Sequence, residues 1–305
     1  MPVTRLGVLG WPVSHSRSPA IHNAALTQLG LTDWRYQRLP VPPEAFEATV
    51  RGLAAAGFRG ANVTIPHKEA ALAIADIATP RAQAIGAANT LTFLPDGQTH
   101  ADNTDAPGLI AALPAGLESG TSALVLGAGG SARAVVWALR EAGMQVSVWN
   151  RTVARAQAVA NELDVAVSDL VNSSSGRRGA SRRDVSARTG LLLNCTSVGL
   201  DDPSQTFKSL PVKAEDLSTY ACVVDLVYRS PVTALLEAAS RQGCAVVDGL
   251  DVLVHQGALS LEAWTGLKAP VGLMREAADA APIEQSDEPR TSQRPARLRG
   301  GATQP

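Results

Sequence analysis

Hydrophobic positions along this chain gather in short runs that are separated by longer amphipathic segments. Short apolar runs predict buried strands, whereas apolar residues that recur every three or four positions predict helices. In the first third of the chain, strands are expected at residues 5–10, 33–39 and 60–64. A hairpin is expected to begin at 89–94 and to turn at 95–97, where Pro, Asp and Gly follow one another.

Helices are expected between these strands. One should start near Ser18, with Ser18 as the N-cap and Pro19 in the first helical position. Others are expected over 43–56 and from about His67. The first third therefore predicts an α/β unit.

A second series of the same kind begins near Thr121. It predicts strands at 123–126, 145–149, 191–194, 222–226 and 245–247. Helices are expected between them, notably over 131–142 and 231–241. This alternation favours parallel strands with helices on both faces of the sheet. The expected fold class is therefore α/β, with a Rossmann-like, doubly wound domain and a second α/β domain separated from it by a cleft.

Composition narrows the classes of partner. With 305 residues, of which 45% are hydrophobic, the chain can bury a sizeable core in one or two domains. A net charge of -1 provides no overall field that would attract nucleic acid or an anionic membrane. No apolar run is long enough to span a bilayer, and the three cysteines have no metal-binding or redox spacing. We expect a cytoplasmic protein that binds neither nucleic acid nor membrane.

Two segments depart from the alternating pattern. Residues 172–190 are rich in Ser, Gly and Arg, which favours a solvated surface loop and leaves an anion-binding patch as the alternative. Residues 282–305 lack apolar periodicity and are expected to be a disordered tail.

A glycine-rich turn follows the predicted strand at 123–126. Its residues are Gly127, Ala128, Gly129, Gly130, Ser131 and Ala132. They fit the spacing G-x-G-x-x-G/A between a strand and a helix, which is the context in which this pattern indicates dinucleotide binding. The first glycine permits the tight turn and the second lets the backbone approach a pyrophosphate at the helix N-terminus.

The end of the next predicted strand indicates which dinucleotide binds. NAD-binding proteins place an acidic residue there for the ribose 2′-hydroxyl. This chain has Asn150, Arg151 and Thr152 instead, with Arg155 one helical turn further on. A guanidinium group can bind a 2′-phosphate through charged hydrogen bonds. The sequence therefore predicts NADP as the cofactor.

Five further motifs carry a family resemblance. They are SHSRSP at 14–19, NVTIPHK at 62–68, GAANT at 86–90, DNTD at 102–105 and DGLDVLVHQ at 248–256. Together with the glycine-rich turn and the arginines that follow it, these motifs resemble, in order, the signature of the shikimate dehydrogenases. The resemblance implies a reversible, NADPH-dependent reduction of 3-dehydroshikimate to shikimate, a step in aromatic amino-acid (chorismate) biosynthesis.

The same resemblance assigns roles to residues. It implies that Ser16 and Ser18 bind the substrate carboxylate. Ring hydroxyls would contact Thr64, Asn89, Asp105, Gln256 and Tyr228. Leu226 and Gly249 would lie against the nicotinamide end of the cofactor.

Lys68 and Asp105 would carry the reaction in this family. Reduction of a ketone needs a proton for the developing alkoxide, and the reverse reaction needs a base. Asp105 should favour a charged Lys68 while burial should oppose it, so we expect the two groups to act as a unit. The sequence leaves open which of them transfers the proton.

The domain organisation expected from this resemblance is discontinuous. Residues 1–104 with 249–281 would bind substrate, and residues 105–248 would bind NADP. The histidines have no metal-ligand spacing, so no metal is expected. A homodimer is compatible with the family, and a quinate/shikimate dehydrogenase, an amino-shikimate dehydrogenase or a non-catalytic ligand-binding regulator remain the alternatives.

Overall fold

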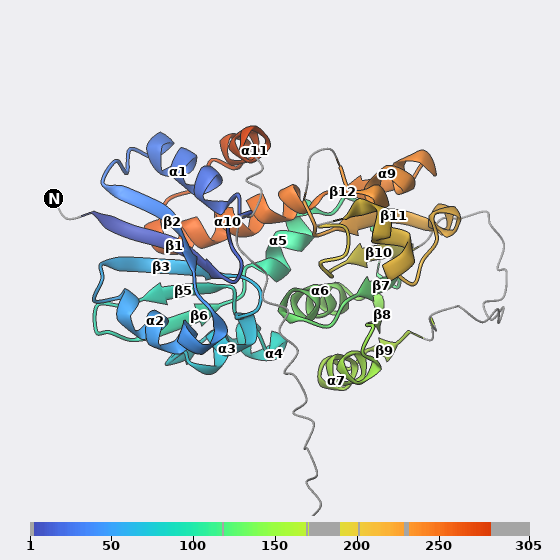
Figure 1. Ribbon diagram of the computed structural model, residues 1–305, viewed down its shortest axis with the longest axis horizontal. Coiled ribbons are helices and arrows are strands. Elements are labelled where there is room, and N and C mark those ends of the chain that lie inside the picture. Colours follow the sequence, from blue (N-terminus) through green and yellow to red (C-terminus); the bar gives the residue numbers. More distant parts are fainter. Residues whose placement is uncertain are drawn as a thin grey trace, which may run out of the picture.

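Two six-stranded sheets lie beside each other, with helices packed around both (Figure 1). The structure, a computed structural model, describes residues 3–117, 119–168, 170, 190–200, 202–228 and 232–281. The predicted loop at 172–190, except for Gly190, and the predicted tail 282–305 lie outside the described residues. Within those residues, no helix has the length and apolar character needed to cross a membrane.

The first sheet, sheet A, has the strand order β2-β1-β3-β5-β6-β4. Its strands are β1 (Thr4–Gly10), β2 (Trp34–Pro40), β3 (Phe58–Val63), β4 (Ile77–Ala78), β5 (Thr90–Phe93) and β6 (Thr99–Asp102). β1 pairs parallel with β2 and β3, whereas β5 runs antiparallel to β3 and forms the predicted hairpin with β6. The helices of this part are α1 (Ser18–Gln28), α2 (Phe46–Leu53), α3 (Lys68–Ala73) and α4 (Pro80–Ile85).

The second sheet, sheet B, has the order β12-β11-β10-β7-β8-β9, and all of its described strand pairs are parallel. Its strands are β7 (Ser122–Leu126), β8 (Gln145–Trp149), β9 (Ala166–Val167), β10 (Gly190–Asn194), β11 (Tyr220–Asp225) and β12 (Ala245–Val247). Its helices are α6 (Gly130–Glu141), α7 (Val153–Leu163), α8 (Thr206–Ser209) and α9 (Ala234–Arg241). Counted along the chain, this is the 3-2-1-4-5-6 order of dinucleotide-binding sheets, in which ligands bind at the carboxyl ends of the strands where the order reverses.

Both faces of sheet B are buried, as its nearly continuous apolar strands predict. Val125 of β7 contributes to one core, together with residues of α6 and α7. Its neighbour Leu124 contributes to the opposite core, together with residues of α9. The predicted α/β class with a doubly wound sheet is therefore confirmed.

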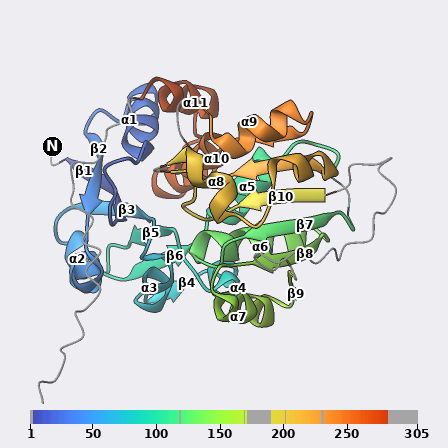
Figure 2. The same cartoon turned by 45° about the vertical axis from the view of Figure 1, so that its right-hand side comes forward.

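Two helices lie where the chain passes from one sheet to the other. α5 (Asp105–Ala112) follows the last strand of sheet A, and α10 (Gly249–Thr265) follows the last strand of sheet B. α10 then runs back along sheet A, and α11 (Val271–Ala280) packs beside α1 (Figures 1 and 2). Trp264 of α10 lies against β3, and its indole nitrogen donates to the Leu91 carbonyl oxygen at 3.0 Å. The assignment of 1–104 with 249–281 as one domain stays a prediction.

Some predicted boundaries are wrong. Ser18 is the first residue of α1 rather than its N-cap; Arg17 holds the flanking position, and the Ser18 amide donates to the Ser16 hydroxyl. The helix expected over 43–56 is a short 3-10 turn followed by α2, which ends at Leu53. α9 starts at Ala234, because Thr233 caps it by accepting from the Leu236 amide.

A buried aromatic cluster joins α1 to sheet A and α10. The imidazole of His22 is fully buried and stacks on Tyr36 at a centroid distance of 4.1 Å. Neither of its ring nitrogens has a hydrogen-bond partner among the described residues. Burial lowers the pKa of His22 to about 3, and the nearby Asn62 side chain opposes this shift only in part.

This depressed pKa predicts acid sensitivity. The unfolded chain binds a proton at His22 below about pH 6.5, whereas the folded chain does not until about pH 3. Folding stability therefore falls as the pH drops through this window, by about 2 kcal/mol between pH 7 and pH 5. A His22→Phe variant should show a correspondingly flatter pH dependence in urea unfolding. An unchanged dependence of stability on pH would contradict the low pKa of His22.

Candidate active site

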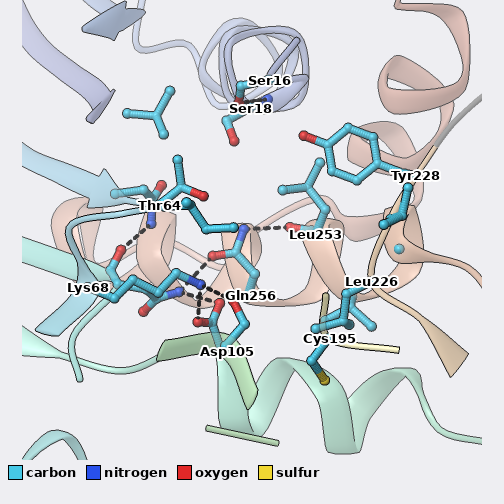
Figure 3. Close-up of a pocket in the computed structure, with 18 of the residues that line it drawn as sticks. Ser16, Ser18, Thr64, Lys68, Asp105, Cys195, Leu226, Tyr228, Leu253 and Gln256 are labelled. Atoms are coloured by element: carbon cyan, nitrogen blue, oxygen red, sulfur yellow. Dashed lines mark hydrogen bonds and ion pairs between the residues drawn. The ribbon is translucent and has the colours of Figure 1, made fainter. Parts of the chain in front are cut away.

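A cavity of about 180 Å³ lies between the two halves of the molecule, one built on sheet A and the other on sheet B. Sheet A and its helices contribute hydroxyl, amide and charged side chains, and the loops after β10 and β11 contribute Cys195, Leu226 and Tyr228. Figure 3 shows Lys68, Asp105 and Gln256 at one end and Ser16, Ser18 and Tyr228 at the other. The structure thus brings residues from distant motifs together around one space.

Lys68 and Asp105 form an ion pair in this cavity. Lys68 Nζ lies 2.6 Å from Asp105 Oδ2, and only 10% and 15% of the two side chains are exposed. Lys68 Nζ also donates to the Ser131 hydroxyl at 2.8 Å. Since Ser131 belongs to the first turn of α6, the ammonium group is held between the two halves of the molecule.

Close packing positions the stem of Lys68. A Cβ atom added at Gly130 would lie 2.7 Å from Lys68 Cβ, which is too close for any real contact. Gly130 therefore has a second use besides opening α6: it gives Lys68 room to reach Asp105.

An amide network fixes the other side of the Asp105 carboxylate. Asn89 Nδ2 donates to Asp105 Oδ1 at 2.8 Å and to Gln256 Oε1 at 3.0 Å. Nε2 of the Gln256 side chain in turn donates to the Leu253 carbonyl oxygen at 2.8 Å. The Thr104 amide donates to Asn89 Oδ1 at 2.7 Å. These bonds orient amide and carboxylate groups that could contact substrate hydroxyls.

The opposite end of the cavity is suited to an anion. Two serine hydroxyls lie there at the start of α1, and the Tyr228 hydroxyl points toward Ser16 and Ser18 (Figure 3). Arg38 Nε donates to the Ser16 carbonyl oxygen at 3.1 Å, and the guanidinium carbon of Arg17 lies 6.0 Å from the centre of the Tyr228 ring. Burial raises the pKa of Tyr228, so its hydroxyl remains a hydrogen-bond donor at neutral pH.

The glycine-rich turn leaves space for a phosphate group. Gly127 has a φ of 119°, which favours glycine, and an added Cβ there would lie 3.1 Å from the Cys195 backbone. At Gly129, by contrast, an added Cβ would meet no atom within 4 Å. No side chain caps the N-terminus of the 12-residue α6, so its first amides are available to an anion.

Leu226 and Gly249 lie next to each other on one wall of the first cavity, where an added Gly249 Cβ would be 2.5 Å from the Leu226 carbonyl oxygen.

A second, larger cavity of about 680 Å³ follows along the carboxyl ends of sheet B. The predicted residues that line it are Asn150, Arg151, Thr152 and Arg155. Lys208 and Lys213 line it too, and none of its described lining residues is acidic. Neither arginine pairs with an acid in the described part of the chain. The cavity can therefore accept a phosphate group.

Some lining residues could not be found from the sequence. His15, Asn62 and Cys195 line the first cavity, and the two lysines line the second. The lysines lie in a polar segment more than fifty positions after Arg151, where nothing in the local pattern points to a ligand. His67, in contrast, is buried against Phe46, and its Nε2 lies 2.7 Å from the Val41 carbonyl oxygen, so its environment is structural.

Three stretches of the chain match families with related names. Residues 8–91 match the shikimate dehydrogenase substrate binding domain. Residues 114–185 match the shikimate / quinate 5-dehydrogenase family. Residues 249–278 match the shikimate 5'-dehydrogenase C-terminal domain. The matches follow one another in the order of the motifs described above.

Similarity also extends over nearly the whole chain. A Methylobacterium radiotolerans protein named shikimate dehydrogenase (NADP(+)) is 50% identical over 277 residues, which cover 86% of this chain and 91% of the relative. A Thermus thermophilus protein of the same name is 45% identical over 91% of this chain and 98% of the relative. The crystal structure of Thermus thermophilus shikimate 5-dehydrogenase in complex with NADP(H) and shikimate aligns with a TM-score of 0.77 at 44% identity, over 91% of this chain and 99% of that chain. This chain belongs to the shikimate dehydrogenase family.

Proposed function

We propose that this protein is an NADP-dependent oxidoreductase that interconverts 3-dehydroshikimate and shikimate. The observation that carries the proposal is the Lys68–Asp105 pair, which lies at 2.6 Å in a cavity bordered by the glycine-rich turn. The relatives' names and the ligands of the similar Thermus structure support the same chemistry. The reaction belongs to the pathway that leads to chorismate and the aromatic amino acids.

The Lys68–Asp105 pair would handle the proton. NADPH would supply the hydride that the ketone carbon needs, from a nicotinamide ring held beside Leu226 and Gly249. Lys68 Nζ, held by Asp105 and Ser131, would donate a hydrogen bond to the ketone oxygen and a proton to the alkoxide that forms. In the oxidation of shikimate the same pair would accept that proton. Because the two groups are hydrogen-bonded, we assign the transfer to the pair.

The remaining cavity residues would orient the ring. Ser16 and Ser18 would bind the carboxylate, with Tyr228 beside them. Thr64, Asn89 and Gln256 would contact ring hydroxyls near the reacting carbon. Fixing both ends places one ring carbon against the wall that carries Leu226 and Gly249, where the cofactor ring would lie.

The second cavity would hold the adenosine end of NADP. Arg151 and Arg155, with Asn150 and Thr152, would bind the 2′-phosphate. The turn from Gly127 to Ser131, which includes Ala128, would bind the pyrophosphate. In this proposal residues 1–104 with 249–281 form the substrate domain and 105–248 the cofactor domain, and closure between them would exclude water.

We infer a cytoplasmic enzyme that acts on small molecules, and a homodimer as its assembly. The net charge of -1 supports a small-molecule substrate, since it provides no field that would attract nucleic acid or an anionic membrane. Sedimentation of the purified protein would test the assembly: a monomer at all concentrations would contradict it.

The absorbance of reduced nicotinamide tests the proposed function. Purified protein is offered shikimate or quinate with NADP or NAD, in the four combinations. We expect shikimate with NADP to give by far the largest kcat/KM. Preference for quinate or for NAD would move the protein to the related dehydrogenases. Ligand binding without turnover in any combination would favour a regulator.

Gly130→Ala should lower activity through Lys68. The new methyl group must displace the lysine stem, and a misplacement of about 1 Å can cost about 100-fold in rate. We expect a 10- to 100-fold loss of kcat, measured at saturating substrate. Gly52→Ala is the matched control, because an added Cβ there meets nothing within 4 Å. Wild-type kcat in Gly130→Ala would contradict the proposed packing role.

A further inference from the structure

Two buried polar side chains that the proposed mechanism does not use lie at the ends of β10 and β11. Asn194 is fully buried and Asp225 is 1% exposed. The two residues face each other across the parallel strand pair, and Asn194 Nδ2 donates to Asp225 Oδ1 at 2.9 Å. Burying a carboxylate costs free energy unless its oxygens accept hydrogen bonds, so the donors around Asp225 determine whether the buried pair is stable.

Asp225 holds the loop that follows β11. Its Oδ1 also accepts from the Val227 amide at 3.1 Å, and its Oδ2 accepts from the Thr233 hydroxyl at 2.7 Å. Burial raises the pKa of Asp225 to about 6 despite these bonds. The carboxylate is therefore satisfied by three donors, two of which lie beyond the end of its own strand.

Asn194 holds the loop that follows β10 in the same way. Its Oδ1 accepts from the Thr196 amide at 3.1 Å and from the Thr196 hydroxyl at 2.7 Å. Its Nδ2 donates to the Val198 carbonyl oxygen at 3.2 Å as well as to Asp225. The side-chain pair thus connects two loops that lie far apart in the sequence.

These loops form the wall between the two ligand cavities. Leu226, Val227 and Tyr228 line the first cavity, beside Cys195. Thr196 and Ser197 line both the first and the second cavity. A dinucleotide that reached from one cavity to the other would pass this wall, and the bond between Asn194 and Asp225 links its two loops.

We propose that Asp225 is a positioning residue for the dinucleotide: by joining the Cys195–Val198 and Leu226–Tyr228 loops, it holds the wall on which the cofactor lies. The inference rests on the proposed function. Removing the carboxylate would leave one N–H of the Asn194 side chain and the backbone N–H of Val227 without their acceptor in a buried place, and both loops would loosen. No contact between Asp225 itself and a ligand is required.

The conservative variant separates hydrogen bonding from charge. In Asp225→Asn, the amide oxygen can keep accepting from Asn194 and Val227, and the new NH₂ group can donate to the Thr233 hydroxyl oxygen. In Asp225→Ala all three bonds are lost. A positioning role therefore predicts that asparagine restores much of what alanine removes.

The test measures NADPH binding by fluorescence titration, and amide hydrogen exchange in the two loops. We expect Asp225→Ala to raise the Kd for NADPH about 10-fold or more, to raise the KM for NADP in parallel, and to speed exchange at Thr196 and Val227. Asp225→Asn should stay within about 3-fold of the wild type. If Asp225→Ala does not fold, Asn194→Ala replaces it, since it frees the first loop while Asp225 keeps two of its bonds.

Thr79→Val is the control for a loss of stability alone. Thr79 caps α4 by accepting from the Ala82 amide, and its hydroxyl donates to Asp102 at 2.7 Å, so it makes the same two kinds of bond as Thr233 but at a helix beside sheet A. It should lower the melting temperature and leave the Kd for NADPH unchanged. An unchanged Kd in Asp225→Ala, or a Kd raised equally in Thr79→Val, would overturn the inference.

The binding readout separates the two proposals. A wild-type protein that binds NADPH but does not oxidise shikimate would contradict the proposed function, and the variants' Kd values would still decide the role of Asp225. A wild-type protein that does not bind NADPH would overturn both.

Discussion

Replacing Lys68 by methionine should lower kcat for shikimate oxidation by about 100- to 10,000-fold, the range over which a positioned proton-transfer group contributes. Methionine keeps the apolar stem that packs over Gly130 and removes the ammonium group that bonds to Asp105 and Ser131. The substrate would still find its hydroxyl and amide partners. We therefore expect KM for shikimate to change much less than kcat.

Three comparisons make this experiment specific. Lys268→Met changes an exposed lysine outside both cavities and should leave kcat unchanged. Asp105→Asn should also lower kcat, and the double variant should lose little more than the worse single variant, because the pair acts as a unit. A Lys68→Met protein that is folded and keeps more than about a third of the wild-type kcat would contradict its assignment to proton transfer.

Arg151→Ala should change the choice of cofactor. A charge-assisted hydrogen bond to a phosphate contributes about 1.5–3 kcal/mol, which corresponds to a 10- to 100-fold rise in KM for NADP. NAD has no 2′-phosphate, so its KM should not rise. Arg155, on the same cavity wall, would retain part of the preference in the single variant, and the variant lacking both arginines should lose most of it.

The measurement is kcat/KM with each cofactor at saturating shikimate. Arg241→Ala is a suitable control, because Arg241 pairs with Glu237 on an exposed helix face and lines neither of the two proposed ligand cavities. If Arg151→Ala reduced kcat/KM for NADP and NAD equally, Arg151 would support the fold of the site rather than recognise the phosphate.

Periodic segments account for what was predictable in the fold. β8 and β12 have the predicted bounds, because β8 alternates polar and apolar residues, β12 is a short apolar run, and turns flank both. The two-residue strands β4 and β9 were missed, since two residues show no periodicity. The Ser18 cap was placed one position too late, because the pattern of a serine before a proline does not show that Ser16 already accepts the first amide.

Site residues were predictable from the sequence where they belong to a recognisable motif. The glycine-rich turn and the Lys68 and Asp105 motifs were recognisable in the sequence, but the bond from Lys68 to Ser131 follows only from the way the two sheets meet. Lys208 and Lys213 come to Arg151 through the sheet order, and Asn194 meets Asp225 through strand register. Such contacts are tertiary, so no local pattern contains them.

Transfer of deuterium from carbon 3 of shikimate would show directly whether this protein oxidises shikimate by hydride transfer to NADP. Shikimate labelled with deuterium at that carbon is oxidised by the wild-type protein with NADP, and the products are analysed by mass spectrometry. We expect the label to appear in NADPH and the carbon product to be 3-dehydroshikimate. Label that remains in the carbon product, or an absence of turnover with this pair of ligands, would contradict the proposed function.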